Sequence, residues 1–267
     1  MLEILQYGFM QNALIAGILI AVICSVIGVF LVLRRMALIG DGLAHISFGG
    51  IAAGLLFGVY PLFSALVFSV LAALGIERLK KMKIYGDAAI AIFFSFGLAL
   101  GVVLVSLSRG FSLDLFSYLF GSILAVSRND LFFISALGVA TVTLIWVFYK
   151  ELLYITFDED SARAGGIAVE NVNAMLIVLT AMAVVTSMRI VGILLVSSFM
   201  VIPASIALVL CKNFRQAMLA SVAIGVAAAI AGLFASYYFN LAAGGAIVLV
   251  LVGGFALALA YKKLLAK

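Results

Sequence analysis

The feature that most constrains this chain is its series of apolar runs, each about twenty residues long and each bounded by charged or turn-forming residues. A helix of that length crosses the hydrocarbon core of a membrane and pairs its own backbone polar groups there. The chain is 67% hydrophobic and 10% charged, unlike a soluble domain. The sequence therefore predicts an all-α, polytopic integral membrane protein with about 8–9 transmembrane helices in one domain over residues 1–267. The runs lie at 9–33, 43–59, 61–79, 87–107, 130–149, 172–187, 190–210, 216–238 and 243–261.

Two places depart from this regular pattern. The stretch 110–127 is shorter than a full span and carries an acidic residue, so we expect an interfacial or re-entrant helix there. Pro203 lies inside the run 190–210, where proline removes one helical hydrogen bond and frees the carbonyl about four residues earlier. The resulting bend is either a tolerated kink or a turn beside a polar pathway.

The basic residues predict the orientation of the chain. With nine spans and the N-terminus outside, 13 of the 16 lysines and arginines lie on the cytoplasmic side, as the positive-inside rule requires. We therefore expect a multi-pass protein of the cytoplasmic (inner) membrane whose C-terminus is cytoplasmic. The few acidic side chains on the outer side, Asp130 among them, would be solvated or would guide cations.

Asp41 and His45 are the most informative polar residues within the apolar runs. His45 is the only histidine of the chain, and residues four apart on a helix share one face. Ionisable groups inside a membrane are costly and usually functional, so the pair could form half of a metal site or part of a proton relay. The alternative is that Asp41 caps the helix after Gly40 and His45 only packs.

One such pair supplies too few ligands for a transition metal, but two copies across a homodimer axis would supply four. Nitrogen and oxygen donors suit zinc(II) and manganese(II), and imidazole favours zinc. Clusters of cysteine or histidine, which would indicate tight storage, are missing from the sequence. A weak site is what a conduit needs, because it must release its ion.

The longest polar connection, at about 150–170, carries the second signal. Acidic residues at 158–160 follow Phe157, and Gly165 and Gly166 follow Ala162, which predicts a short helix with acids at its start and glycine at its end. Such a helix is either a docking element for a cytoplasmic partner or a solvated linker.

Several function classes are excluded or disfavoured by the sequence. It contains no G-x-x-x-x-G-K-[ST] motif, so the chain does not bind ATP through a P-loop. It also has no H-E-x-x-H motif and no G-x-S-x-G serine, which disfavours a membrane-embedded enzyme. The net charge of +5 comes from residues at the ends of apolar runs and does not indicate binding to nucleic acid.

Four stretches of the sequence carry a family resemblance: R-R-M-A-L-I-G-D-G-L-A-H at 34–45, D-L-F-S-Y-L-F-G-S-I-L-A-V at 114–126, F-D-E-D-S-A-R-A-G-G at 157–166 and V-G-I-L-L-V-S-S-F-M-V-I-P-A at 191–204. With them, and over essentially its whole length, the sequence resembles the permease subunits of zinc-, manganese- and iron-uptake ATP-binding-cassette (ABC) importers. Within that family, L-A-H at 43–45 and Y-L-F-G-S-I-L-A-V at 118–126 look more like the zinc-uptake (ZnuB-type) branch.

The resemblance implies a homodimer around a central pathway, two separate ATPase subunits on the cytoplasmic side and an extracytoplasmic metal-binding protein. Asp41 and His45 match the family's D-x-x-x-H positions, where metal passes between the protomers. The segment 157–166 matches the coupling segment that contacts the ATPase; Phe157 and Asp158 open it, and Ala162 and Gly166 are the closest correspondences. ATP would bind to the partner subunit, and no cofactor would be held stably.

These observations together predict a permease that imports zinc(II), driven by ATP hydrolysis on a separate ATPase subunit. The nearer alternative is the same machine carrying manganese or iron. The farther one is an ion-coupled secondary carrier that needs no ATPase and uses Asp41 and His45 as a proton relay.

Overall fold

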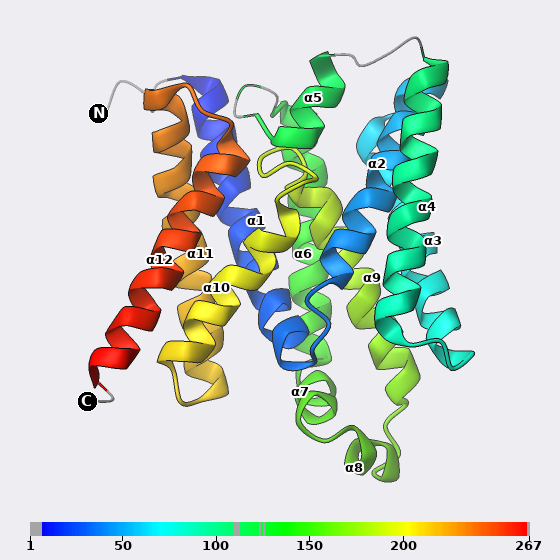
Figure 1. Cartoon of the computed structure of the whole chain (residues 1–267), viewed down its shortest axis with the longest axis vertical. Coiled ribbons are helices and arrows are strands. Elements are labelled where there is room, and N and C mark those ends of the chain that lie inside the picture. Colours follow the sequence, from blue (N-terminus) through cyan, green and yellow to red (C-terminus); the bar gives the residue numbers. More distant parts are fainter. Residues whose placement is uncertain (1–6, 109–112, 123, 125, 266–267) are drawn as a thin grey trace. The chain divides into compact units, whose positions relative to one another are not determined.

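The computed structural model describes residues 7–108, 113–122, 124 and 126–265. Every regular element in this part of the chain is a helix (Figure 1), which confirms the all-α fold. Eight of the helices described are long and apolar enough to cross a membrane, and α10 is a shorter apolar helix. The elements are α1 (Gly8–Leu33), α2 (Ile39–Phe57), α3 (Pro61–Lys81), α4 (Gly86–Leu107), α5 (Leu113–Phe120), α6 (Arg128–Val147), α7 (Tyr149–Phe157), α8 (Glu159–Ala164), α9 (Val169–Ser187), α10 (Val196–Leu210), α11 (Phe214–Phe239) and α12 (Ala243–Leu265).

The helices group into two compact units. The first comprises Met1–Ala37, Phe116–Ala136 and Ser187–Lys267. Within it α1 packs against α10 and α11, and α12 packs against the same two helices. Glycine permits a close approach of α1 to α10, since a Cβ atom on Gly28 of α1 would lie 2.0 Å from the Met200 carbonyl oxygen of α10. Lipid is as apolar as the helix side chains, so membrane helices gain no hydrophobic driving force when they associate. They associate through close packing instead, which small residues at the contacts allow.

The second unit comprises Leu38–Leu115 and Leu137–Thr186. In this unit α2 packs against both α3 and α4, and α7 packs against α8 (Figure 1). Glycines again set the spacing: a Cβ atom on Gly50 would lie 2.7 Å from the Cα of Ala65 in α3, and one on Gly97 of α4 would lie 2.5 Å from the Cα of Ile46. The middle of α2 is therefore held at backbone distance from both neighbours.

The chain passes from one unit to the other four times. The passages follow Ala37, Leu115, Ala136 and Thr186. Three of them lie inside helices, in α5, in α6 and just before the last residue of α9, so those helices contribute residues to both units.

Two predicted segments are shorter in the structure than the apolar pattern suggests. The run 190–210 is helical only from Val196, because the chain before it turns at Gly192, whose φ is +84°. A Cβ atom on Gly192 would lie 2.5 Å from the Leu119 carbonyl oxygen, so another segment occupies the space that a straight helix would need. The short helix expected within 110–127 is α5; residues 110–112, 123 and 125 lie outside the described part of the chain.

Candidate functional site

Asp41 and His45 both lie in the first half of α2. The helix begins at Ile39 with Leu38 as its N-cap residue, so the alternative that Asp41 is the cap is wrong. Asp41 instead occupies the first turn, where the helix dipole favours a carboxylate. Both side chains are half-buried, and they lie one turn apart on one face of the helix, as the spacing predicts.

One hydrogen bond fixes the chemistry of His45. Its Nδ1 atom lies 3.0 Å from the backbone carbonyl oxygen of Asp41. A carbonyl oxygen can only accept, so Nδ1 carries the proton and donates it. In the neutral imidazole the lone pair then resides on Nε2, which is the arrangement found in metal-binding histidines whose other nitrogen is held by the backbone.

The position of the imidazole ring is set by α4. The ring packs against the Phe94 ring with 4.0 Å between centroids and an interplanar angle of 37°. One turn beyond Phe94 along α4, Gly97 brings the α4 backbone against His45 and Ile46, and Gly42 of α2 faces Ile90 in the same way. His45 is therefore fixed by one hydrogen bond along its own helix and one ring contact across to α4.

These two residues do not make a complete metal site. Among the residues that the structure describes, histidine, cysteine, aspartate and glutamate nowhere gather in a group of three or more that could hold an ion. A carboxylate and an imidazole from one chain supply two donors, whereas transition metals in proteins take four or more. A metal ion held by these two residues would need further ligands from a second copy, from water or from the backbone.

The predicted short helix in the polar connection is present as α8. Asp158, which separates α7 from α8, is its N-cap: the carboxylate accepts hydrogen bonds from the Ser161 amide at 2.9 Å and from the Ser161 hydroxyl at 2.5 Å. These bonds, the hydroxyl bond foremost, lower the pKa of Asp158 below its ordinary value of 3.8. The chain leaves the helix through Gly166, whose φ of +84° is the left-handed conformation typical of a helix end.

The other residues predicted for coupling differ in exposure. Phe157 is 65% exposed, a large apolar side chain on a polar connection, whereas Ala162 is fully buried. A buried alanine in a six-residue helix means that α8 is packed down on one side, whereas the phenylalanine at the end of α7 is largely exposed.

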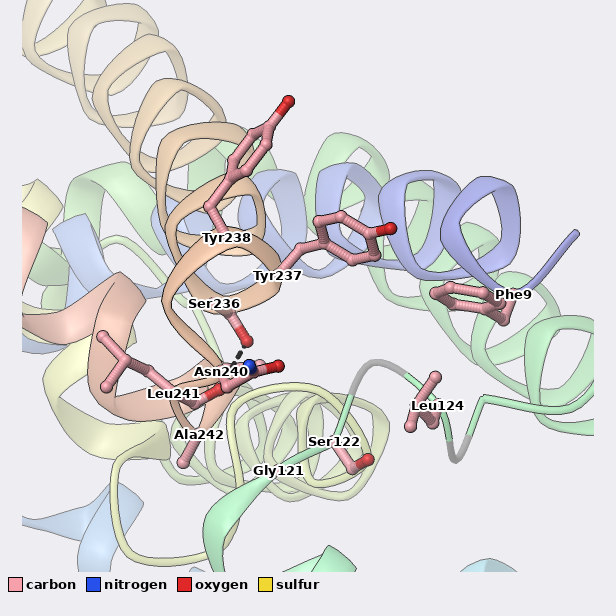
Figure 2. Close-up of a pocket in the computed structure, with 11 residues that line it drawn as sticks. Phe9, Gly121, Ser122, Leu124, Ser236, Tyr237, Tyr238, Asn240, Leu241 and Ala242 are labelled. Carbon is pink, nitrogen blue, oxygen red and sulfur yellow. Dashed lines mark hydrogen bonds between the residues drawn. The ribbon is translucent and has the colours of Figure 1, made fainter. Parts of the chain in front are cut away.

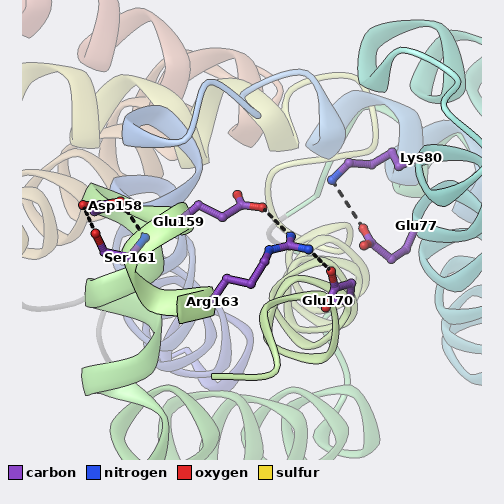
Figure 3. Close-up of polar contacts among 7 residues, drawn as sticks. All are labelled: Glu77, Lys80, Asp158, Glu159, Ser161, Arg163 and Glu170. Atoms are coloured by element: carbon purple, nitrogen blue, oxygen red, sulfur yellow. Dashed lines mark hydrogen bonds and ion pairs between the residues drawn. The ribbon is translucent and has the colours of Figure 1, made fainter. Parts of the chain in front are cut away.

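An ion-pair network that the sequence pattern does not reveal ties α8 to α9. Figure 3 shows Arg163 between two carboxylates: its guanidinium lies 3.5 Å from Glu159 of α8 and 2.8 Å from Glu170 of α9. These side chains are about half exposed, so the pairs contribute little to stability. They link α8 to the start of α9.

Pro203 lies within α10 and is buried in the first unit. Asp41, His45 and the segment 157–166 all lie in the second unit. The structure thus gathers the predicted metal residues and the predicted coupling residues in one compact body and assigns the proline to the other.

A cavity of about 610 Å³ lies in the first unit (Figure 2). Phe9, Ser122, Leu124 and the end of α11 line it, where the Ser236 hydroxyl donates to the Leu241 carbonyl oxygen at 2.6 Å. Among the described residues, those that line it carry aromatic and hydroxyl groups and no carboxylate, imidazole or thiol.

The prediction that Asp130 is solvated is wrong. Asp130 is fully buried and forms an ion pair with Arg189 at 3.3 Å. The S-x-x-D spacing of Ser127 and Asp130 indicates the capping box at the start of α6, but no sequence signal indicates the ion pair.

Comparison with known proteins identifies the family. The sequence profile of the ABC 3 transport family matches residues 6–262. The manganese transport system membrane protein MntC of Listeria innocua is 37% identical over 248 residues, which cover 92% of this chain and 88% of that protein. A probable iron transport system membrane protein of Haemophilus influenzae is 32% identical over 265 residues, covering 99% and 97%.

The fold agrees with a solved structure, PsaBC from Streptococcus pneumoniae in complex with Fab. It matches with a TM-score of 0.86 and 37% identity over 96% of this chain and 92% of that one. These comparisons support the family, and they do not single out its zinc-uptake branch. The chain belongs to the ABC 3 transport family and is a multi-pass membrane permease subunit of a metal-uptake ABC importer, in which ATP hydrolysis is the task of a separate subunit.

Proposed function

We propose that this permease conducts a divalent transition metal past Asp41 and His45, and that manganese(II) is its principal cargo. The observation that carries the proposal is the hydrogen bond from His45 Nδ1 to the Asp41 carbonyl. It leaves Nε2 as a metal donor one turn from a carboxylate. Manganese is favoured over zinc because similar chains such as MntC are named for manganese transport.

Two copies of the chain would complete the site. A homodimer would bring two carboxylates and two imidazoles to a shared axis, four donors in all. Oxygen-rich and nitrogen-containing sets bind manganese(II) less tightly than later first-row metals. Weak binding suits a pathway, since an ion held tightly would not leave. Zinc(II), indicated by the resemblance of 43–45 and 118–126 to the zinc branch, and iron, named for the Haemophilus relative, are the alternative cargoes.

The proposed coupling runs through the second unit. Two ATPase subunits would contact Phe157, Asp158, Ala162 and Gly166 on the cytoplasmic side. The exposed Phe157 and the capped α8 support this assignment. The ion pair between Arg163 and Glu170 would carry motion of α8 into α9. An extracytoplasmic binding protein would deliver the metal, and both units would act as one permease domain.

The proposed orientation places the N-terminus outside and the C-terminus in the cytoplasm. The basic residues at the ends of α3 and α12, Arg78, Lys80, Lys81, Lys262 and Lys263, support it. Pro203 would bend α10 beside the pathway.

The test is uptake of radioactive manganese into proteoliposomes that contain the permease and its ATPase subunit. We expect Asp41→Ala and His45→Ala each to lower ATP-dependent uptake by about tenfold or more, because each removes a ligand from both protomers. Asp87→Ala is the matched control, since Asp87 is an exposed acid in the first turn of α4. Wild-type uptake by His45→Ala would show that this residue only packs. Inhibition by zinc at concentrations well below those of manganese would indicate zinc as the principal cargo. Uptake independent of the ATPase would favour a secondary carrier.

A further inference from the structure

A buried charge pair lies where α5, α6 and the segment before α10 meet within the first unit. The Arg189 Nε atom is 3.3 Å from Asp130 Oδ2, with side-chain exposures of 15% and 1%. The same oxygen accepts hydrogen bonds from the Ser127 amide at 3.0 Å and the Ser127 hydroxyl at 2.8 Å. The carboxylate thus has a cation and two hydrogen-bond donors around it. Removing either charge would leave the other buried without its opposite charge.

Arg189 has a second contact on its other side. Its guanidinium carbon lies 4.2 Å from the centroid of the Tyr118 ring, and Tyr118 is 1% exposed. Arginine stacked on an aromatic face gains a cation–π attraction that strengthens when water is excluded. The three side chains Tyr118, Asp130 and Arg189 are named here the Arg189 clamp.

The backbone around the clamp is paired as well. The Ile193 amide donates to the Tyr118 carbonyl at 2.9 Å, and the Ser122 amide donates to the Arg189 carbonyl at 3.0 Å. The segments 118–122 and 189–193 therefore run antiparallel. Gly121 makes the approach possible, since a Cβ atom there would lie 2.0 Å from the Ile190 carbonyl oxygen.

The clamp is adjacent to three of the four passages between the two units. Tyr118 lies just after the passage that follows Leu115, and Arg189 lies just after the one that follows Thr186. Asp130 lies one and a half turns before the passage in α6 that follows Ala136. The pair and the stacking thus fasten three connecting segments to the first unit at one point.

We propose that Arg189 and Asp130 are positioning residues for transport: the clamp is a fixed anchor that stays closed through the cycle while the second unit moves. The inference rests on the proposed function, because the second unit holds Asp41, His45 and the segment 157–166. Without the anchor, motion imposed on α8 would be absorbed where the chain enters the first unit, and ATP would be hydrolysed without metal transfer.

The first test measures manganese delivered per ATP hydrolysed in proteoliposomes of the full complex. Arg189→Met and Asp130→Asn are expected to lower that ratio by about tenfold or more, as small misplacements far from a site can do. Arg189→Lys, which keeps the charge beside Asp130, should recover much of it. The control is Arg128→Met, an exposed arginine at the start of α6. A purely structural role would lower the amount of assembled complex and leave the ratio unchanged, and that result would overturn the proposal.

A second test does not depend on the stability of those variants. Leu119 and Leu194 are joined by a backbone hydrogen bond of 3.4 Å, and a disulfide formed between cysteines at these two positions would hold the two segments together. The background carries Cys24→Ala and Cys211→Ala, which remove the two native thiols. We expect oxidised Leu119→Cys/Leu194→Cys to transport as fast as the reduced form. Transport that stops on oxidation and returns with reductant would show that the clamp opens, and would overturn the proposal.

The two proposals fail in different ways. Wild-type liposomes that take up neither manganese, zinc nor iron with ATP would overturn the proposed function. Wild-type uptake combined with unchanged ratios in the clamp variants would overturn the anchor alone.

Discussion

Gly97 of α4 controls how closely α4 approaches the turn of α2 that carries His45. A Cβ atom there would lie 2.5 Å from both the Cα and the amide nitrogen of Ile46 and 2.7 Å from the carbonyl carbon of His45. All three are backbone atoms, so no side chain can rotate away. We therefore expect Gly97→Ala to push the two helices apart beside His45.

The size of the effect follows from these distances. Ordinary contacts of a Cβ atom are 3.4–4 Å, so the backbones must separate by about 1 Å. Overpacking of this kind costs about 1–3 kcal/mol, and the better helix propensity of alanine offsets about 1 kcal/mol of it. Stability should fall only modestly. Displacing a ligand by about 1 Å is far more costly for function, and can reach about a hundredfold.

The assay compares Gly97→Ala with Gly253→Ala in the reconstituted complex. Gly253 lies in α12 with no atom within 4 Å of its Cβ position, so its variant gains helix propensity without a clash. We expect manganese uptake to fall about tenfold or more in Gly97→Ala and to remain at the wild-type level in Gly253→Ala. Wild-type uptake by Gly97→Ala would refute the reasoning, because the α2–α4 contact would then be too soft to position His45.

Three further outcomes are expected. Gly244→Ala should prevent accumulation of folded permease, because its Cβ would lie 1.8 Å from the Val191 carbonyl oxygen, whereas Gly245→Ala, with nothing within 4 Å, should accumulate normally by immunoblot. Asp158→Ala should weaken co-purification of the ATPase subunit more than Glu159→Ala, because only Asp158 caps α8. The hydrogen bonds from Ser161 lower the pKa of Asp158 below 3.8, so its contribution is complete above that value and is lost only as pH falls through the lower pKa of the folded loop. The ratio of Asp158→Asn to wild-type uptake should therefore be constant from about pH 5 to 8, and a ratio that approaches one towards pH 5 would contradict this.

The sequence alone determined the class of fold and most of its elements. In a membrane a segment must satisfy its own backbone, so an apolar run of sufficient length has only the helix available. The runs at 9–33, 87–107 and 216–238 accordingly match α1, α4 and α11 closely. The capped helix α8 could also be predicted, since Asp158 and Gly166 act on the turn in which they stand. The sequence therefore predicts those features whose physical cause lies within the same short segment.

Tertiary structure decided what depends on contacts between distant segments. Nothing in the apolar pattern around 190 shows that Gly192 turns the chain beside Leu119, so α10 begins later than its run. The sequence around Asp130 indicates a surface acid. Only the structure shows its ion pair with Arg189, which is 59 residues away in sequence. The sequence likewise places Asp41 and His45 on one face, but only the packing of Phe94 and Gly97 fixes the imidazole. The physical reason is the same in each case: a buried charge, a close backbone approach and a ring contact are properties of two partners, and a sequence pattern reports on one segment at a time.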